Sequence, residues 1–335
     1  ERKTQFEGTL DQLYNQNFRK FLEYNRQDTL LLFKIHDKLK FLDLANEIAH
    51  ENTVLLPTVM GSVAMIEQAI INEAHSRGLI VQDKIRKGND DDDETTAAGA
   101  YVATPKRGVH EWVGAVDINS LYPSVIRALN MAPETIIGQL RPIITDQYMA
   151  DKKAKLALGK GGKGGKRSKK TAEDITGPIL WEGLFGSLEY TAVMNQERGT
   201  MLTIDWERGG SDQASAAEIW KMIFDSNQPW MLTANGTIFT YEQEGVIPGL
   251  LTRWYSERKQ VQAKLKQATT KEEIEFLDKR QLVKKILLNS AYGALLNAHC
   301  RFYDIRIGQS TTLNGRQIVK HMSGHLNQSI TGIYD

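Results

Sequence analysis

The sequence is poor in cysteine and contains no long apolar run. Cys300 is the only cysteine in 335 residues, which excludes an internal disulfide framework and indicates a reducing compartment. No stretch of about 18 apolar residues is present, so we expect no membrane-spanning helix. The chain opens Glu1-Arg2-Lys3-Thr4, with neither an initiator methionine nor an apolar signal segment. This start suggests a processed chain, a partial gene or a trimmed chain.

The sequence also has almost no net charge, and the balance of +1 does not by itself indicate a nucleic-acid partner. The charge is unevenly placed, because residues 152–170 read KKAKLALGKGGKGGKRSKK. Lysines spaced by glycines cannot bury a core, so a mobile basic loop is predicted here. The loop either contacts phosphates or is a tolerated surface insertion. It lacks the Gly-x-x-x-x-Gly-Lys-Ser/Thr pattern of a phosphate-binding loop.

Hydrophobic periodicity predicts a chain that begins with helices. Apolar residues recur at helical spacing over residues 10–45 and 53–77. Strands are then predicted at 100–102 and 111–117, around a turn at 105–108. Pro123 suits the first turn of a helix over residues 124–130, because a first-turn residue has no helical partner for its N–H.

The second half predicts a hairpin turn and then a pair of long helices. Asn235-Gly236 is a turn signal before the strand-like residues 237–241. Residues 249–267 and 271–296 follow as two antiparallel helices. Thr270 and Glu273 have the spacing of a capping box at the start of the second helix.

Asp117 is the first candidate for chemistry. It follows the apolar residues 112–116 at a predicted strand end. A hard carboxylate oxygen there suits Mg²⁺ together with carbonyl and phosphate oxygens. A strand-end aspartate that caps the next helix is the alternative.

A polar stripe on the second long helix is the second candidate. Gln281, Lys285, Asn289 and Tyr292 fall within an arc of about 80°, given about 100° per residue. Lysine supplies charge and tyrosine a stacking surface, which suits a triphosphate and a base. The polar face of an ordinary amphipathic helix is the alternative. Arg258 and Lys259 on the preceding helix can converge on the same phosphates.

Two long motifs carry a resemblance to a known family. DINSLYPSVI, residues 117–126, resembles the A motif of family B DNA polymerases, Asp-x-x-Ser-Leu-Tyr-Pro-Ser. KKILLNSAYG, residues 284–293, resembles their B motif, Lys-x-x-x-Asn-Ser-x-Tyr-Gly. Both occur in the right order and flank the helical hairpin. The neighbouring segments 99–102, 130–135, 235–236, 245–248 and 301–304 are similar to replicative polymerases of T-even-like phages.

The resemblance implies a role for each matching residue. Asp117 and the carbonyl of Ile118 would bind two catalytic Mg²⁺ ions, and Tyr122 would lie under the sugar and exclude a 2′-hydroxyl. The backbone at Ser120 and Leu121 would meet the triphosphate. The phosphates and the new base pair would be held from the hairpin side by Arg258, Lys285, Asn289, Tyr292 and Gly293.

A third, shorter motif resembles the family's third exonuclease motif, Tyr-x-x-x-Asp. Tyr24 and Asp28 match it, and they are one helical turn apart on one face. In that motif the aspartate binds metal and the tyrosine orients the attacking water. The chain is therefore expected to carry a remnant of a 3′–5′ proofreading exonuclease.

The resemblance also implies the fold. We expect an α+β chain made of part of a polymerase palm, with an antiparallel sheet and helices, and a helical-hairpin fingers domain. The helical end of an RNase H-like exonuclease would precede them. The expected segments are the exonuclease end 1–40, a connector 41–88, the palm 89–244, the fingers 245–297 and further palm 298–335.

The family's C motif, Asp-Thr-Asp-Ser, is absent from the sequence. The second metal-binding aspartate and the thumb are therefore missing, and we expect little activity from the chain alone. The expected function is DNA-templated DNA synthesis in phage replication, in the cytoplasm of the infected bacterial host. Expected partners are primer-template DNA, dNTPs, a C-terminal polymerase portion, an N-terminal exonuclease portion and a possible sliding clamp. A fragment that binds nucleotide or DNA without catalysis, or one piece of a split polymerase, is the alternative.

Overall fold

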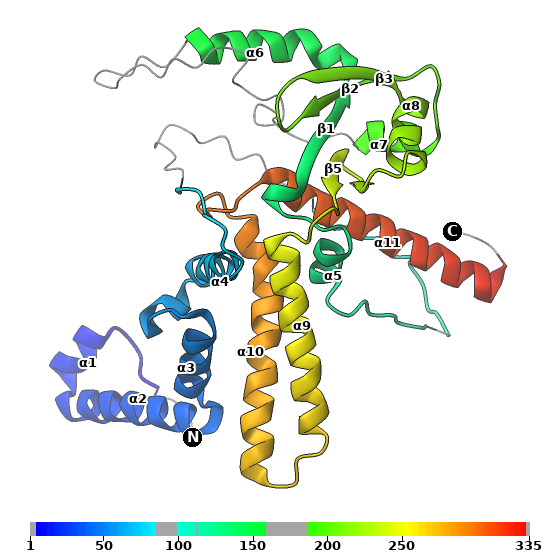
Figure 1. The fold of residues 1–335 in the computed structure, drawn as a ribbon. Helices are drawn as coiled ribbons and strands as arrows, with labels where there is room; N and C mark the ends of the chain where they lie inside the picture. Colours follow the sequence, from blue (N-terminus) through cyan, green and yellow to red (C-terminus); the bar gives the residue numbers. More distant parts are fainter. Residues whose placement is uncertain (1–4, 85–98, 112, 159–186, 333–335) are drawn as a thin grey trace. The chain divides into compact units, whose positions relative to one another are not determined.

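The computed structural model describes residues 5–84, 99–111, 113–158 and 187–332, as drawn in Figure 1. The chain divides into two compact units, Glu1–Met60 and Gly61–Asp335. Each unit has its own interior, and the two are described in turn. The domain boundaries expected from the sequence remain predictions.

The first unit is helical, as the periodicity predicts. It contains α1 (Leu10–Gln16), α2 (Phe18–Leu39), α3 (Phe41–Asn52) and a 3₁₀ turn (Leu56–Met60). The helices begin and end at capping residues, including a capping box between Thr9 and Gln12 and a left-handed Lys40 with φ 53°. Several large apolar side chains of this unit are exposed: Leu32, Phe33, Leu42, Leu55 and Met60.

The second unit contains one five-stranded antiparallel sheet in the order β3-β2-β1-β5-β4. Its strands are β1 (Ile136–Pro142), β2 (Met201–Trp206), β3 (Ser211–Ser215), β4 (Trp230–Leu232) and β5 (Thr237–Thr240). The Asn-Gly turn confirms its prediction, because Gly236 has φ 80° and β5 begins at the next residue.

Short helices cover the sheet and complete its core. They are α7 (Ser187–Met194), α8 (Ala216–Trp220) and a π-helical turn (Lys221–Asp225), and α7 contacts both α8 and β1. The fully buried side chains here include Leu140, Val193, Ile204, Ile219 and Ile238. Burial of such side chains contributes about 1.5–3 kcal/mol each, which makes this cluster the main stabilising element of the sheet.

A buried arginine joins the sheet to the helix that follows β1. Arg141 donates to both carboxylate oxygens of Asp205 on β2, at 2.6 and 3.1 Å. It also donates to Thr145 at 2.9 Å and pairs with Asp146, the first residue of α6 (Asp146–Leu158). An arginine buried to 5% side-chain exposure needs such partners, because an unpaired buried charge is strongly destabilising.

Long helices form the rest of the second unit. The predicted hairpin is confirmed as α9 (Val246–Leu265) and α10 (Lys271–Leu295), which pack side by side in yellow and orange in Figure 1. Thr270 caps α10 by accepting from the N–H of Glu273 at 3.3 Å. Against this pair pack α4 (Ser62–Ser76) and α5 (Leu121–Ala128), and α5 and α10 also contact α11 (Ile305–Thr331).

Two predictions of local structure are wrong. Residues 100–102 and 113–117 form no strand, and Val113 and Val116 are 79% and 62% exposed. A strand requires a hydrogen-bonded partner, and no described strand pairs with either segment.

The basic loop begins later than predicted, because residues 152–158 belong to α6. Alanine, leucine and lysine favour a helix, which continues until the glycine-rich stretch. Residues 159–170 of the predicted loop lie outside the described residues.

The chain is α+β, as predicted, with an antiparallel sheet and long helices. Along the described ranges, no helix is both long and apolar enough to cross a membrane.

Candidate functional site

Asp117 precedes the turn at 119–120 that leads into α5. Its side chain is exposed, and it follows residues 113–116, which have no regular secondary structure. The turn ends at Ser120, whose left-handed backbone (φ 52°, ψ 49°) caps α5. Ser120 donates to the side chain of Asn119 at 3.2 Å, and Pro123 occupies the first turn of the helix, as predicted. The turn therefore starts α5 while the carboxylate of Asp117 stays accessible to solvent.

Three helices meet at the ring of Tyr122. The ring of Tyr292 on α10 lies 4.4 Å away, centroid to centroid, with a tilt of 41°. Gly315 on α11 also packs against this ring, since a Cβ built there would lie 3.4 Å from Cε1 of Tyr122. The structure thus brings together two tyrosines that are far apart in the sequence, one from each long motif.

The environment of Tyr292 keeps its phenol neutral. Burial raises its pKa to about 12, Tyr122 adds to the rise, and a hydrogen bond with Thr312 of α11 opposes it. At neutral pH this phenol is a hydrogen-bonding group and not an anion. The tyrosine pair is therefore an uncharged aromatic contact between α5 and α10 at neutral pH.

The polar stripe of α10 is partly solvent-facing and partly used in packing. Lys285, Asn289 and Gly293 are exposed, whereas Gln281 accepts from Arg258 Nε on α9 at 3.5 Å. The neighbouring Lys284 is buried and pairs with Glu257 of α9. No hydrogen bond or ion pair links Asp117 to Lys285 or Asn289 among the described residues.

The start of α9 is held by side chains from two other segments. Asn130 donates to the carbonyls of Thr240 and Gln243, each at 2.8 Å, and accepts from Gly245 N at 2.9 Å. Glu134 accepts from Val246 N at 2.6 Å. The base of the hairpin is therefore fixed to the loop that follows α5.

Arg77, which follows α4, holds the same region from the other side. Its guanidinium donates to the carbonyls of Glu244 and Gly245 at 3.0 and 3.4 Å, and it pairs with the carboxylates of Glu73 and Glu244. Gly249 on α9 lies against it, because a Cβ there would fall 1.9 Å from Nη2 of Arg77.

Comparison with known proteins assigns the chain to a protein family. A sequence model of DNA polymerase family B matches residues 57–176 and 187–334. The chain belongs to DNA polymerase family B. The resemblance drawn from residues 117–126 and 284–293 is therefore confirmed.

Relatives of this family B chain include phage polymerases. It is 24% identical to the DNA-directed DNA polymerase of Enterobacteria phage T4 and 22% identical to that of Escherichia phage RB69. Each alignment covers 99% of this chain and 34% of the relative. A solved family B polymerase from Pyrobaculum calidifontis aligns with a TM-score of 0.56 at 16% identity, over 97% of this chain and 32% of that one. The chain thus spans about a third of the length of the relatives it matches.

The described residues contain no clustered set of metal-ligating side chains. Across the described residues, no group of three or more His, Cys, Asp or Glu side chains is positioned to hold an ion. Asp117 and the carbonyl of Ile118 are oxygen ligands of the kind that Mg²⁺ takes, together with substrate phosphates and one further carboxylate. Their role at a metal stays a prediction.

The expected exonuclease pair lies in the first unit. Tyr24 and Asp28 are one turn apart on α2, and both are half-buried. The ring of Phe6 meets that of Tyr24 edge-on at 5.2 Å, which fixes its orientation. Their shared helix face is as predicted, and their role stays a prediction.

Sequence reasoning missed three residues around Tyr122. Arg127 on α5 donates to Thr252 of α9 at 3.0 Å and lies 4.6 Å over the ring of Tyr255, so it binds the helix of the A motif to the hairpin. Thr312 and Gly315 complete the seat of the tyrosine pair. The small residues among 308–315, inside a long helix, are the signal that could have indicated close packing there: Gly308, Ser310, Thr311, Thr312 and Gly315.

Proposed function

We propose that this chain carries half of the active site of a DNA-templated DNA polymerase. The proposal depends on one observation, the 4.4 Å contact between Tyr122 of the A motif and Tyr292 of the B motif. Spacing in the sequence does not require the two motifs to meet. Their contact, the exposed Asp117 five residues before Tyr122 and family membership together support a nucleotide site at this position.

The proposed roles follow from side-chain chemistry. Asp117 and the Ile118 carbonyl are ligands for Mg²⁺, which when bound lowers the pKa of a primer 3′-hydroxyl and stabilises the leaving pyrophosphate. The backbone of Ser120 and Leu121 opens α5, and N–H groups at a helix start favour anions. Tyr122 is held rigidly by its neighbours, so its ring can exclude a 2′-hydroxyl by steric contact.

The hairpin side supplies charge and shape. Lys285 and Asn289 are exposed and able to meet phosphates, and Arg258 can join them after leaving its weak 3.5 Å hydrogen bond to Gln281. Tyr292 and Gly293 would border the new base pair. A neutral tyrosine suits this place, because an anionic one would repel the triphosphate.

Further polypeptide is needed to complete the enzyme. We propose that a C-terminal portion supplies the second carboxylate and the thumb, and that an N-terminal portion completes a 3′–5′ exonuclease at Tyr24 and Asp28. Family membership and the placement of Tyr24 and Asp28 on one face of α2 support the second idea. The completed enzyme would bind primer-template DNA and dNTPs and could bind a sliding clamp. It would act in the cytoplasm of an infected bacterium.

Primer extension with a candidate C-terminal partner tests the polymerase proposal. The partner carries Asp-Thr-Asp-Ser, and extension is measured with this chain, with Asp117→Asn and with the control Asp225→Asn, another exposed aspartate. We expect extension only with both polypeptides, and a loss of at least about a hundredfold in Asp117→Asn, since even indirect partners of a metal cost 10–100-fold. Extension that survives Asp117→Asn contradicts the metal assignment.

The same assay separates this proposal from the alternative, a fragment that binds nucleotide without catalysis. The alternative predicts that this chain binds dNTP saturably and that no partner produces extension. For sugar discrimination, Tyr122→Ala should raise ribonucleotide incorporation, whereas Tyr122→Phe keeps the ring and should not. Equal incorporation in both variants would refute the steric role.

A further inference from the structure

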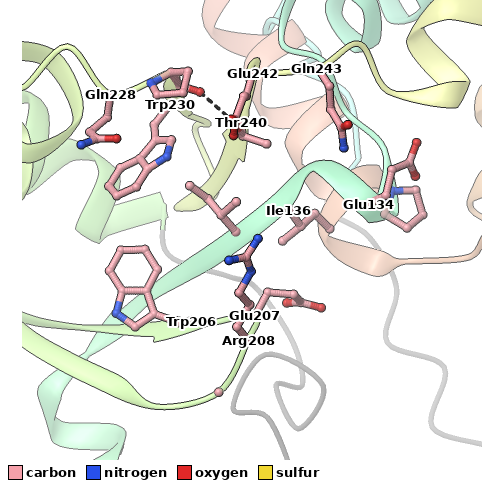
Figure 2. A pocket seen from close by; sticks show the side chains of 14 residues that line it. Glu134, Ile136, Trp206, Glu207, Arg208, Gln228, Trp230, Thr240, Glu242 and Gln243 are labelled. Carbon is pink, nitrogen blue, oxygen red and sulfur yellow. Dashed lines mark hydrogen bonds between the residues drawn. The ribbon is translucent and has the colours of Figure 1, made fainter.

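A cavity of about 750 Å³ opens on the sheet, and the roles proposed above leave it unexplained. Its walls come from the end of β2, the segment before β4 and the loop that precedes α9. In Figure 2, Trp206 and Trp230 lie along one side, Glu134 and Gln243 lie opposite, and the Arg208 side chain extends between them. The volume is that of a small-molecule site.

The two tryptophans form a fixed aromatic corner. Their ring centroids are 5.8 Å apart and the planes are inclined by 53°. Both rings pack against the buried core of the sheet, and Trp206 Nε1 donates to Asp212 at 2.7 Å. Because the rings contact each other, no third ring fits between them, and a flat ligand would stack on one exposed face.

The polar lining leaves one cation without a partner. Glu207 is already paired with Arg306 at 2.7 Å, and Glu134 accepts from Val246 N. Arg208 is exposed and makes no hydrogen bond or ion pair within the described parts of the chain. The exposed amides of Gln228 and Gln243 add donors and acceptors at the rim.

We propose that this cavity binds one nucleobase-bearing group, separate from the nucleotide site at Tyr122. The base would stack on Trp206 or Trp230, and the amides of Gln228 and Gln243 would meet its edge. Arg208 would bind a single phosphate.

The charges of the lining support this ligand class. The positive charge of Arg208 repels a cationic ligand. The carboxylates of Glu134 and Glu242, which also line the cavity, repel the additional negative charge of a triphosphate. The ligand that fits is a mononucleotide, either free or as one unit of a single strand.

Such a ligand would also touch the segment that holds the hairpin. Gln243 lines the cavity and its carbonyl accepts from Asn130, while Glu134 lines it and accepts from the first N–H of α9. Occupancy should therefore slow hydrogen exchange at the N–H groups of Gly245 and Val246.

Binding is measured on the whole chain by quenching of tryptophan emission with deoxyadenosine monophosphate. The variants are Arg208→Gln, the control Arg198→Gln at another exposed arginine, Trp230→Leu, and Lys285→Ala to remove binding at the hairpin. We expect affinity to fall about tenfold or more in Arg208→Gln and about fivefold or more in Trp230→Leu, while the other two variants retain it. Thermal unfolding monitored for each variant separates lost binding from lost structure.

Two further probes distinguish the source of the ligand. A short single-stranded oligonucleotide that binds more tightly than the monophosphate indicates a strand, and the reverse indicates free nucleotide. An abasic oligonucleotide of equal length should bind at least tenfold more weakly than the normal one. Equal binding by both, or binding that Lys285→Ala abolishes and Arg208→Gln does not change, overturns the proposal.

Discussion

Replacement of Asn130 tests how the base of the helical hairpin is held. Its side chain makes three hydrogen bonds, to Thr240, Gln243 and Gly245, and the residue is only 7% exposed. Removing it leaves the buried N–H of Gly245 and two carbonyls without this partner. A buried unsatisfied group costs about 1–3 kcal/mol, and we expect about 3 kcal/mol in total because the carbonyls can gain water.

The backbone conformation of Asn130 adds a second cost to the free energy lost on substitution, and this cost can be measured separately. Its φ of 50° lies in the left-handed region, which asparagine adopts more readily than alanine. The left-handed conformation costs an alanine about 1 kcal/mol, so Asn130→Ala should lose about 4 kcal/mol and Asn130→Gly about 3 kcal/mol. The difference between the two variants isolates the backbone term.

Urea unfolding followed by tryptophan emission measures both losses. All six tryptophans follow residue 60, so their emission reports on the second unit alone. Gln243→Ala is the matched control, because only its carbonyl contacts Asn130, and it should change stability by less than about 0.5 kcal/mol. A loss below about 1 kcal/mol in Asn130→Ala, or a greater loss in Asn130→Gly, would refute this account.

Three further outcomes follow from the structure. Burial raises the pKa of Asp146, but hydrogen bonds from Arg141, Thr203 and Gln213 outweigh burial and lower it. The stability that wild type has over Asp146→Asn should therefore be complete above about pH 4 and shrink as the pH falls further. Urea midpoints of the two proteins that differ equally at all pH values would contradict this. Burial raises the pKa of Tyr292 to about 12. The difference in ultraviolet absorbance between wild type and Tyr292→Phe should therefore show no phenol ionisation below about pH 11. Ionisation near pH 10, about the value of a free tyrosine, would disprove the burial of Tyr292. Gly249→Ala should cost about 1 kcal/mol by displacing the Arg77 guanidinium. The cost should be smaller in an Arg77→Ala background, where only the Glu244 side chain remains near the added Cβ; additive losses in the two-variant cycle would show that Gly249 and Arg77 are independent.

The features that sequence predicts well here are local. The hairpin over 245–297 follows from apolar periodicity and from the cap at Thr270, and both act within one or two helical turns. The motif at 117–126 was recognisable because its pattern is long. The left-handed Ser120 and Pro123 shape the turn with no help from distant residues.

The features that sequence misses depend on distant partners. Residues 113–117 have the composition of a strand, yet the described chain gives them no strand to pair with. The meeting of Tyr122 with Tyr292, and the place of Gly315 behind them, result from the packing of α5, α10 and α11. The cavity beside Trp206 and Trp230 likewise unites segments that no spacing rule connects.

The absence of a side chain at Gly315 has a consequence for how Tyr122 can change. An alanine there would just touch the ring, since its Cβ would stand 3.4 Å from Cε1, whereas a bulkier group would have to displace the ring or the side chain of Leu121. The tolerance for mutation at this helix position is thus dictated by an aromatic ring nearly two hundred residues earlier. A substitution that restores the packing would have to change Tyr122 on α5 and Tyr292 on α10 together. Gly315, Tyr122 and Tyr292 are therefore expected to change together in evolution and not one at a time.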